Sequence, residues 1–278
     1  MNIDYFENLH ETVATAIDED FKGTDLTAEL VDCSKKATAE VVTRSRAVIA
    51  GRPWVDEVFG QIDKEVILDW KVNEGDLVDP GTLLFTASGS ARSLLTTERT
   101  ALNFLQTLSG TATRTRHYVD LVKHTSVRLL DTRKTIPGLR LAQKYAVKIA
   151  GGHNHRIGLF DAYLIKENHI NVAGSIATAV ERARILSPDS RVEVEVENLE
   201  EFRMAIDARP DWIMLDNFEY ADLIEAVAST NENIKLEASG GIEQDSDLVR
   251  IAETGVDYIS IGALTKHCEA TDLSMRFK

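Results

Sequence analysis

Two segments of the sequence decide the fold, V-R-L-L-D-T-R-K at residues 127–134 and A-Y-L-I-K-E-N-H at residues 162–169. In each, a short apolar run stops at charged and hydrogen-bonding residues. Buried strands of parallel α/β folds end in this way, and the loops that follow them carry function. The same pattern recurs along the chain, with predicted strand ends near Asp131, Lys166, Glu197, Asp216, Ser239 and Ile261.

Helical segments separate these strands, at residues 175–186, 199–208, 221–228 and 245–253. Repeated βα units predict a parallel sheet, and about six of them suggest a barrel, even an incomplete one. A doubly wound open sheet is the alternative. No glycine-rich dinucleotide fingerprint follows a strand, so we favour the barrel.

The N-terminal part of the chain has a different pattern. Residues 2–17 have helical spacing, and residues 37–88 contain short strands separated by turn residues. A helix is predicted at residues 91–108 and, after residues 109–113, a second one to about residue 123. We therefore expect an α/β protein with a smaller N-terminal α+β sandwich domain (residues 1–110) and a C-terminal parallel β/α barrel-like domain (residues 111–278).

Composition narrows the class of protein. The 278 residues are 44% hydrophobic and 27% charged, as in ordinary globular proteins, and the net charge of −14 argues against nucleic acid as the main partner. No apolar run approaches the roughly 20 residues of a membrane span, and the first residues lack the basic and apolar regions of a signal peptide. We expect a cytoplasmic protein without a membrane partner.

The segment 131–169 inverts the overall charge, with seven cationic side chains against three anionic ones. Lys144 and Lys148 are interpreted as members of a solvated helix face. The other cations share loops with Gly, Asn and His, which favours a pocket for a multiply anionic ligand.

The strand R-V-E-V-E-V-E at residues 191–197 alternates valine with glutamate. A strand inside a barrel has no solvent face, so these carboxylates must point into the barrel or toward cations. Burying them without partners is costly, so we expect Lys166, Arg133 or a metal nearby. An edge strand with its glutamates in water is the alternative.

Two further strand ends suggest a magnesium site and a phosphate site. Asp216 is a plausible Mg²⁺ ligand together with Glu195, because this ion prefers carboxylate and phosphate oxygens. Glycines after the last two strands, at Ser239-Gly240-Gly241 and Gly262, allow backbone N–H groups to approach a phosphate.

Three histidines, His153, His155 and His169, lie in the cationic segment. Their spacing is a weak zinc signal, since no helix or third close ligand accompanies it. Hydrogen bonds to an anion or to a carboxylate are the favoured interpretation.

The sequence resembles the quinolinate phosphoribosyltransferase family over nearly its whole length. The blocks that carry the resemblance are E-R-T-A-L-N at 98–103, D-T-R-K-T at 131–135, N-H-R at 154–156, L-I-K-E-N-H at 164–169, E-V-E at 193–195, L-D-N at 215–217 and E-A-S-G-G at 237–241. The resemblance implies a reaction of quinolinate with 5-phosphoribosyl-1-pyrophosphate that gives nicotinate mononucleotide, pyrophosphate and CO₂, with Mg²⁺ as the cofactor, in NAD biosynthesis.

The resemblance also assigns roles to residues. Quinolinate would be bound by Arg133, His155, Arg156 and Lys166, with Arg99 entering from the small domain of a neighbouring subunit in a homodimer. Phosphoribosyl pyrophosphate would be bound by Lys134, Glu195, Asp216, Ser239, Gly240, Gly241 and Gly262. The catalytic set would be Lys134, Lys166, Glu195 and Asp216, the last two holding Mg²⁺ and the ribose hydroxyls.

Three other functions remain open from the sequence. A related phosphoribosyltransferase could take nicotinate, although one carboxylate needs fewer cations. A barrel lyase could use Lys166 as a Schiff-base nucleophile. A non-catalytic anion-binding barrel is the third alternative.

Overall fold

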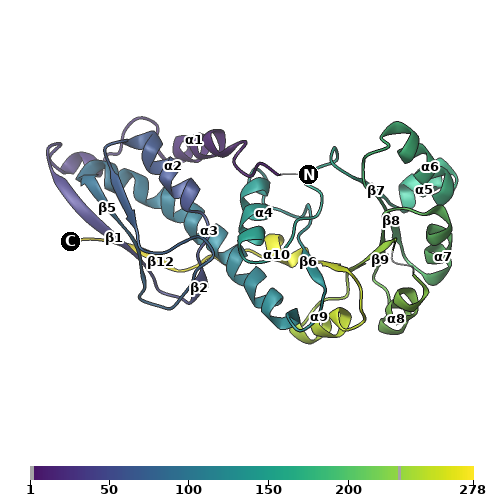
Figure 1. The fold of residues 1–278 in the computed structure, drawn as a ribbon. Coiled ribbons are helices and arrows are strands. Elements are labelled where there is room, and N and C mark those ends of the chain that lie inside the picture. The colour runs from purple at the N-terminus through teal and green to yellow at the C-terminus, as the bar shows by residue number, and fades with distance from the viewer. Residues whose placement is uncertain (1–2, 231–232) are drawn as a thin grey trace. The chain divides into compact units, whose positions relative to one another are not determined.

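The computed structural model describes residues 3–230 and 233–278, and the chain forms two compact units. Unit 1 comprises Met1–Arg116, Thr135–Gly151 and Leu264–Lys278; unit 2 comprises His117–Lys134 and Gly152–Ala263. Neither unit is one continuous stretch of the chain. Figure 1 shows the course of the chain from one end to the other.

Unit 1 contains an antiparallel sheet of four strands in the order β12-β1-β5-β3. These strands are β12 (Leu273–Phe277), β1 (Lys36–Thr43), β5 (Leu83–Ser90) and β3 (Ile67–Trp70), and a separate two-stranded ladder joins β2 (Ala47–Val48) to β4 (Leu77–Val78). The helical elements are α1 (Leu9–Asp20), η1 (Ala28–Leu30), α2 (Arg52–Ile62), α4 (Arg140–Ile149) and most of α3 (Ala91–Val122) and of α10 (Ala263–Lys266). Trp54, Phe85, Leu94 and Leu105 are among the fully buried side chains of its core.

Unit 2 is a curved parallel sheet of six strands in the order β6-β11-β10-β9-β8-β7. The strands are β6 (Arg128–Leu130), β7 (Tyr163–Ile165), β8 (Val192–Val196), β9 (Trp212–Asp216), β10 (Lys235–Ser239) and β11 (Tyr258–Ser260). Between them run α5 (Glu167–Ala173), α6 (Ile176–Leu186), α7 (Leu199–Ala208), α8 (Tyr220–Ser229) and α9 (Asp245–Ala252), on the outer side of the strands in Figure 1. A parallel bridge between Leu130 and His153 extends the β6 edge.

The predicted fold class is confirmed: a β/α barrel-like parallel sheet accompanies a smaller antiparallel-sheet domain. All six predicted strand ends lie within a residue or so of the observed ones. Among the described residues, no helix is both long and apolar enough to cross a lipid bilayer.

The prediction of strands alone for residues 37–88 is wrong, because this stretch contains helix α2. Trp54, Val55, Val58 and Phe59 are buried on one face of that helix, at a spacing that fits a helix rather than a strand. Pro53 in its first turn supports the start, since proline lacks only an N–H that has no helical partner there.

Two helix boundaries also differ from the sequence interpretation. Helix α1 begins at Leu9 rather than at residue 2, which lies outside the described residues, and it continues to Asp20. The break predicted at residues 109–113 is absent, because α3 runs unbroken from Ala91 to Val122. Gly110 serves close packing there: a Cβ on it would lie 2.0 Å from the carbonyl oxygen of Glu269.

The interpretation of Lys144 as part of a solvated helix face is wrong. Its side chain is 0% exposed in α4, whereas Lys148 on the same helix is exposed as expected. The stem of a lysine is four methylene groups long and packs as an apolar side chain, so the charge of a residue alone does not place it on the surface.

Candidate active site

The carboxyl ends of the unit 2 strands form one edge of the sheet. The parallel registers pair Ile165 with Val194, Ser239 with Asp216, and Ser260 with Leu130. The residues that follow these positions therefore leave the sheet on the same side. All predicted site residues except Arg99 belong to unit 2.

Lys166 and Glu195 form an ion pair at this edge. Lys166 directly follows β7, and its Nζ donates to the Oε2 of Glu195 on the neighbouring strand β8. The backbone N–H of Lys166 donates to Nδ1 of His169 at 3.0 Å, so this histidine caps the start of α5. The expectation that a cation lies near the glutamates of this strand is confirmed for Glu195. The edge-strand alternative is wrong, because β8 lies between β7 and β9.

A buried cluster of His155, Glu193 and Glu237 lies deeper in the barrel. The Nε2 of His155 is 2.9 Å from the Oε2 of Glu193 on β8 and 3.3 Å from the Oε2 of Glu237 on β10. Both carboxylates are 0% exposed, and the His155 side chain is 6% exposed. Burial, followed by the charge of Glu193, raises the pKa of Glu237 to about 7.

Asp131 connects the D-T-R-K segment at residues 131–134 to the N-H-R segment at residues 154–156. Its fully buried carboxylate follows β6 and accepts hydrogen bonds from the His155 backbone N–H at 3.0 Å and from Nδ2 of Asn154 at 2.6 Å. The D-T-R-K segment after β6 and the N-H-R segment are thereby fixed to each other.

Arg156 is half-buried and close enough to Arg133 for the two positive charges to repel. Burial lowers the pKa of the Arg156 guanidinium, and the charge of Arg133 lowers it further. Nη1 of Arg156 donates to the Ala162 carbonyl at 3.4 Å. Two like charges held together in this way are suited to a ligand with more than one negative charge.

The loops after β9 and β10 are interlocked. Asn217 adopts a left-handed backbone with φ 55°, and its N–H donates to the Ser239 carbonyl at 2.8 Å. Gly240 and Gly241 also have positive φ values, 84° and 69°. Near this loop, Gly262 follows β11, where a Cβ would lie 3.0 Å from the Cδ of Lys134. Gly240 and Gly262 therefore make room for Asn217 and Lys134, whereas a Cβ on Gly241 would meet no atom within 4 Å. Gly241 is thus the glycine whose lack of a side chain suits a close approach of phosphate to the backbone.

Two sets of side chains offer ligands for a cation. Glu195 and Asp216, at the ends of adjacent strands, supply hard carboxylate oxygens that suit Mg²⁺. The ligand atoms of His155, Glu193 and Glu237 also lie within 4.8 Å of one another. In that second set, His155 Nε2 lies 2.9 Å from Glu193 Oε2, but within the described residues neither Nε2 nor any of the four carboxylate oxygens makes a hydrogen bond of good geometry, so the distance alone does not account for the cluster.

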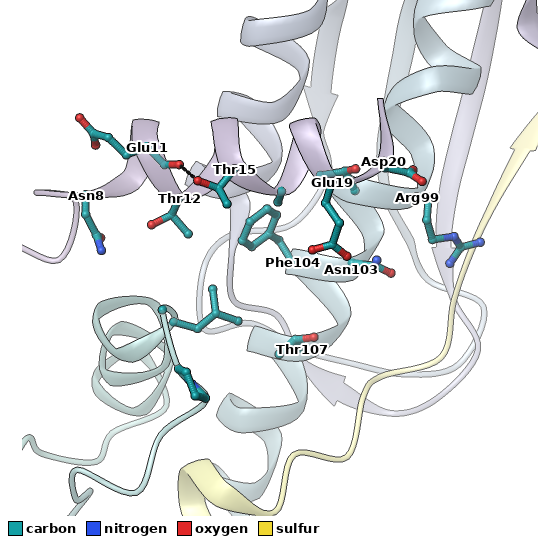
Figure 2. Close-up of a pocket in the computed structure, with 15 residues that line it drawn as sticks. Asn8, Glu11, Thr12, Thr15, Glu19, Asp20, Arg99, Asn103, Phe104 and Thr107 are labelled. Atoms are coloured by element: carbon teal, nitrogen blue, oxygen red, sulfur yellow. Dashed lines mark hydrogen bonds between the residues drawn. The ribbon is translucent and has the colours of Figure 1, made fainter. Parts of the chain in front are cut away.

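Arg99 lies in unit 1, exposed on α3, and lines a cavity of ≈ 560 Å³. Figure 2 shows Thr12, Thr15 and Glu19 of α1 on one side of this cavity and Asn103 of α3 on another. The turn at residues 137–139 also contributes to the lining. The lining next to Arg99 thus combines polar and acidic groups with apolar side chains such as Phe104 and Leu139.

Comparison with protein families assigns both parts of the chain. Residues 25–109 match the model of the quinolinate phosphoribosyl transferase N-terminal domain, and residues 111–276 match that of the C-terminal domain of the same family. The chain belongs to the quinolinate phosphoribosyltransferase family.

Relatives in this family are similar over nearly their full lengths. The chain is 41% identical to a probable nicotinate-nucleotide pyrophosphorylase [carboxylating] of Bacillus subtilis, over 92% of this chain and 89% of that protein. It is 39% identical to the corresponding enzyme of Mycobacterium leprae, over 97% of each. The solved nicotinate-nucleotide pyrophosphorylase of Francisella tularensis superimposes with a TM-score of 0.95 at 47% identity, covering 100% of this chain and 98% of that one.

Sequence reasoning gave no site role to three residues that organise the site of this quinolinate phosphoribosyltransferase family member: Asp131, Asn217 and Glu237. It placed Glu193 inside the barrel but did not identify His155 as its neighbour. Glu193 and Glu237 carry a weak signal, since each is a charged residue directly between two apolar residues of a strand. Their convergence on His155 carries none, because the three residues come from separate segments of the chain.

Proposed function

We propose that this chain transfers the phosphoribosyl group of 5-phosphoribosyl-1-pyrophosphate to quinolinate, with decarboxylation, and so forms nicotinate mononucleotide, pyrophosphate and CO₂ for NAD biosynthesis. The observation that carries the proposal is the edge at which paired guanidinium groups, two carboxylates and a glycine loop follow the strands of one sheet. The names of its relatives describe the same activity.

Quinolinate would be bound by the cationic side chains of the site. Its two adjacent carboxylates match Arg133 and Arg156, because guanidinium groups bind carboxylates through two parallel hydrogen bonds. Bound quinolinate would also relieve the repulsion between these two arginines. Lys166 adds a third cation to the proposed quinolinate site, and the family resemblance implies that His155 lies at the same site.

Phosphoribosyl pyrophosphate would be bound by Lys134, by the loop Ser239-Gly240-Gly241 and by Gly262. The 5-phosphate would accept hydrogen bonds from backbone N–H groups of the glycine loop, and Lys134 would face the pyrophosphate. Glu195 and Asp216 would bind the ribose hydroxyls.

Mg²⁺ is proposed as the cofactor, held by Glu195 and Asp216 together with substrate oxygens. The donor set fits a hard cation, and the ion would neutralise charge on the departing pyrophosphate. Because Lys166 donates to one oxygen of Glu195 in this structure, Lys166 and the ion would share that carboxylate.

The reaction needs positioning and charge more than a strong base. The bond between ribose C1 and pyrophosphate breaks with both electrons going to pyrophosphate, and the pyridine nitrogen donates its pair to C1. Glu195 and Asp216 favour the positive charge on the ribose ring. The nitrogen is then cationic, and its positive charge stabilises the electron pair that CO₂ leaves on the adjacent C2, where a proton is finally added. Holding the two substrates in line supplies much of the rate.

The alternatives fit the contacts less well. Nicotinate, with one carboxylate, does not account for two guanidinium groups at the site. A lyase would need Lys166 as a free amine, whereas its ammonium group is ion-paired with Glu195.

A homodimer with shared sites is proposed as well, with the N-terminal domain (residues 1–110) supplying Arg99 to the barrel of its neighbour. Mixing the inactive variants Arg99→Ala and Lys166→Ala should restore part of the activity, since one site in the mixed dimer is then intact. No recovery despite measured subunit exchange would place each site within a single chain. The cytoplasmic location stays a prediction.

The decisive assay combines purified protein with quinolinate, phosphoribosyl pyrophosphate and Mg²⁺ and follows nicotinate mononucleotide and CO₂. Product should form, disappear on chelation of the metal, and be absent when nicotinate replaces quinolinate. Turnover of nicotinate but not of quinolinate would support phosphoribosyl transfer as the reaction but would show that quinolinate is not the substrate. Activity that survives complete chelation would reject Mg²⁺.

A further inference from the structure

Neither ring nitrogen of His155 is open to a substrate, because Nδ1 is hydrogen-bonded and Nε2 is buried, although within the described residues Nε2 makes no hydrogen bond of good geometry. Nδ1 accepts the backbone N–H of Arg156 at 2.8 Å, and Nε2 faces the carboxylates of Glu193 and Glu237 at 2.9 and 3.3 Å. The side chain is 6% exposed. A substrate carboxylate therefore finds no available nitrogen on this ring.

These contacts determine where the ring carries its proton. Burial lowers the pKa of His155, but its interactions with the Glu193 and Glu237 carboxylates outweigh burial and raise it to about 9. A second proton on Nδ1 would nevertheless point at the Arg156 N–H, 2.8 Å away. We therefore assign a neutral ring with its hydrogen on Nε2, and the cluster keeps a proton on Glu237 instead.

The residues around the His155 imidazole restrict its movement. Nη2 of Arg191 lies 3.7 Å from Glu193 Oε2, and its guanidinium lies 4.0 Å over the ring of Trp212. On the other side, the backbone N–H of His155 donates to Asp131. Strands β8 and β10 and the loop after β6 thus fix one residue, and that residue directly precedes Arg156.

We propose that His155 is a positioning residue: the buried carboxylates of Glu193 and Glu237 hold its ring, and the ring holds the backbone of Arg156 so that the guanidinium meets quinolinate. In this role the imidazole does not contact quinolinate. The proposal rests on the proposed binding of quinolinate by Arg156.

A double-mutant cycle on the full-length protein tests this proposal. Quinolinate affinity is measured by calorimetric titration for the native protein, His155→Ala, Arg156→Ala and the double variant. The quinolinate concentrations extend high enough to measure the Kd of the weakest-binding variant. If His155 acts through Arg156, His155→Ala weakens quinolinate binding roughly tenfold in the native background and has almost no further effect in the Arg156→Ala background. Equal factors in both backgrounds would show that the ring binds quinolinate directly and would overturn the proposal.

Two readouts separate this outcome from misfolding and from failure of the proposed function. Binding of phosphoribosyl pyrophosphate should be unchanged in His155→Ala; an equal loss for both substrates would mean a structural role only, and would also overturn the proposal. Arg156→Ala alone must weaken quinolinate binding. If it does not, the proposed substrate site is wrong, independently of His155.

A measurement on the unmodified protein needs no variant. Nitrogen-15 NMR of the histidine rings should find His155 as the neutral Nε2–H tautomer, both before and after quinolinate is added. A change of tautomer or of charge on addition of quinolinate would contradict the positioning role, because it would require a new partner at one of the ring nitrogens.

Discussion

The side-chain oxygen of Asn217 occupies the space that a side chain on Gly240 would need. A Cβ built on Gly240 would lie 2.0 Å from Asn217 Oδ1, and both residues have positive φ values. Asn217 Nδ2 also donates to the Asp216 carboxylate at 3.2 Å. The residue proposed to bind ribose and the loop proposed to bind the 5-phosphate are therefore parts of one contact.

Gly240→Ala should therefore impair phosphoribosyl pyrophosphate binding more than it impairs folding. The new methyl must displace Asn217, and with it the hydrogen bond to Asp216. We expect at least a tenfold rise in the Kd for this substrate, alongside the roughly 1–2 kcal/mol that a non-glycine residue costs in a left-handed conformation.

Gly255→Ala is the matched control for this change. Gly255 has a similar φ of 93°, but its nearest neighbour would be an ordinary contact at 3.4 Å. It should lose comparable stability in urea unfolding and keep its substrate affinity. Unchanged affinity in Gly240→Ala would mean that this loop does not bind the phosphate.

Glu195→Gln should reduce turnover while leaving the protein folded. The amide keeps the size of the side chain but removes the charge that pairs with Lys166 and is proposed to bind Mg²⁺. We expect kcat to fall on the order of 10²-fold, as for loss of one electrostatic group at a reacting centre, and the Mg²⁺ concentration for half-maximal activity to rise.

Glu197→Gln is the control on the same strand end, because Glu197 is exposed two residues later. Its kinetics and metal dependence should match those of the native protein. Equal effects of the two substitutions would indicate a general dependence on negative charge at this end of the sheet rather than a specific ligand.

Gly110→Ala and Gly60→Ala should have opposite effects on stability. Both glycines lie inside helices, where alanine is normally preferred by about 1 kcal/mol. A Cβ on Gly60 meets no atom within 4 Å, whereas one on Gly110 would overlap the Glu269 carbonyl. Thermal unfolding should show a stabilised Gly60→Ala and a Gly110→Ala destabilised by about 1–3 kcal/mol. Stabilisation of both would mean that residues 269–270 move away readily.

These sites show how far the sequence predicts the molecule. The barrel strands were predictable because each is a short apolar run ended by polar residues, and Lys166, Glu195 and Asp216 follow from that pattern. Helix α2 was missed because its apolar residues lie between strands and were assigned to the same pattern.

Long-range packing was out of reach of the sequence. The sequence predicts a break between helices at Gly110, whereas the structure shows that a glycine is needed there to let the Glu269 backbone approach the helix. Glu237 is buried beside His155, which lies more than 80 positions earlier in the chain, and a local sequence pattern cannot predict such a contact.

The contribution of Glu237 to stability should fall as pH rises from about 4.5 to about 7. Burial raises the pKa of Glu237 from 4.5 to about 7 in the folded chain. Between these values the folded state keeps a proton that the unfolded state has released. Each rise in pH within this window therefore lowers the free energy of unfolding, by up to about 3 kcal/mol in total.

Glu237→Gln removes this dependence, because the amide is neutral at every pH. Urea unfolding at pH 5 and pH 8 should give a smaller difference between the two conditions in Glu237→Gln than in the native protein. Glu181→Gln, an exposed position on α6, should keep the native difference. An identical pH dependence in Glu237→Gln and the native protein would mean that Glu237 is ionised throughout, with His155 rather than Glu237 carrying the proton of the cluster.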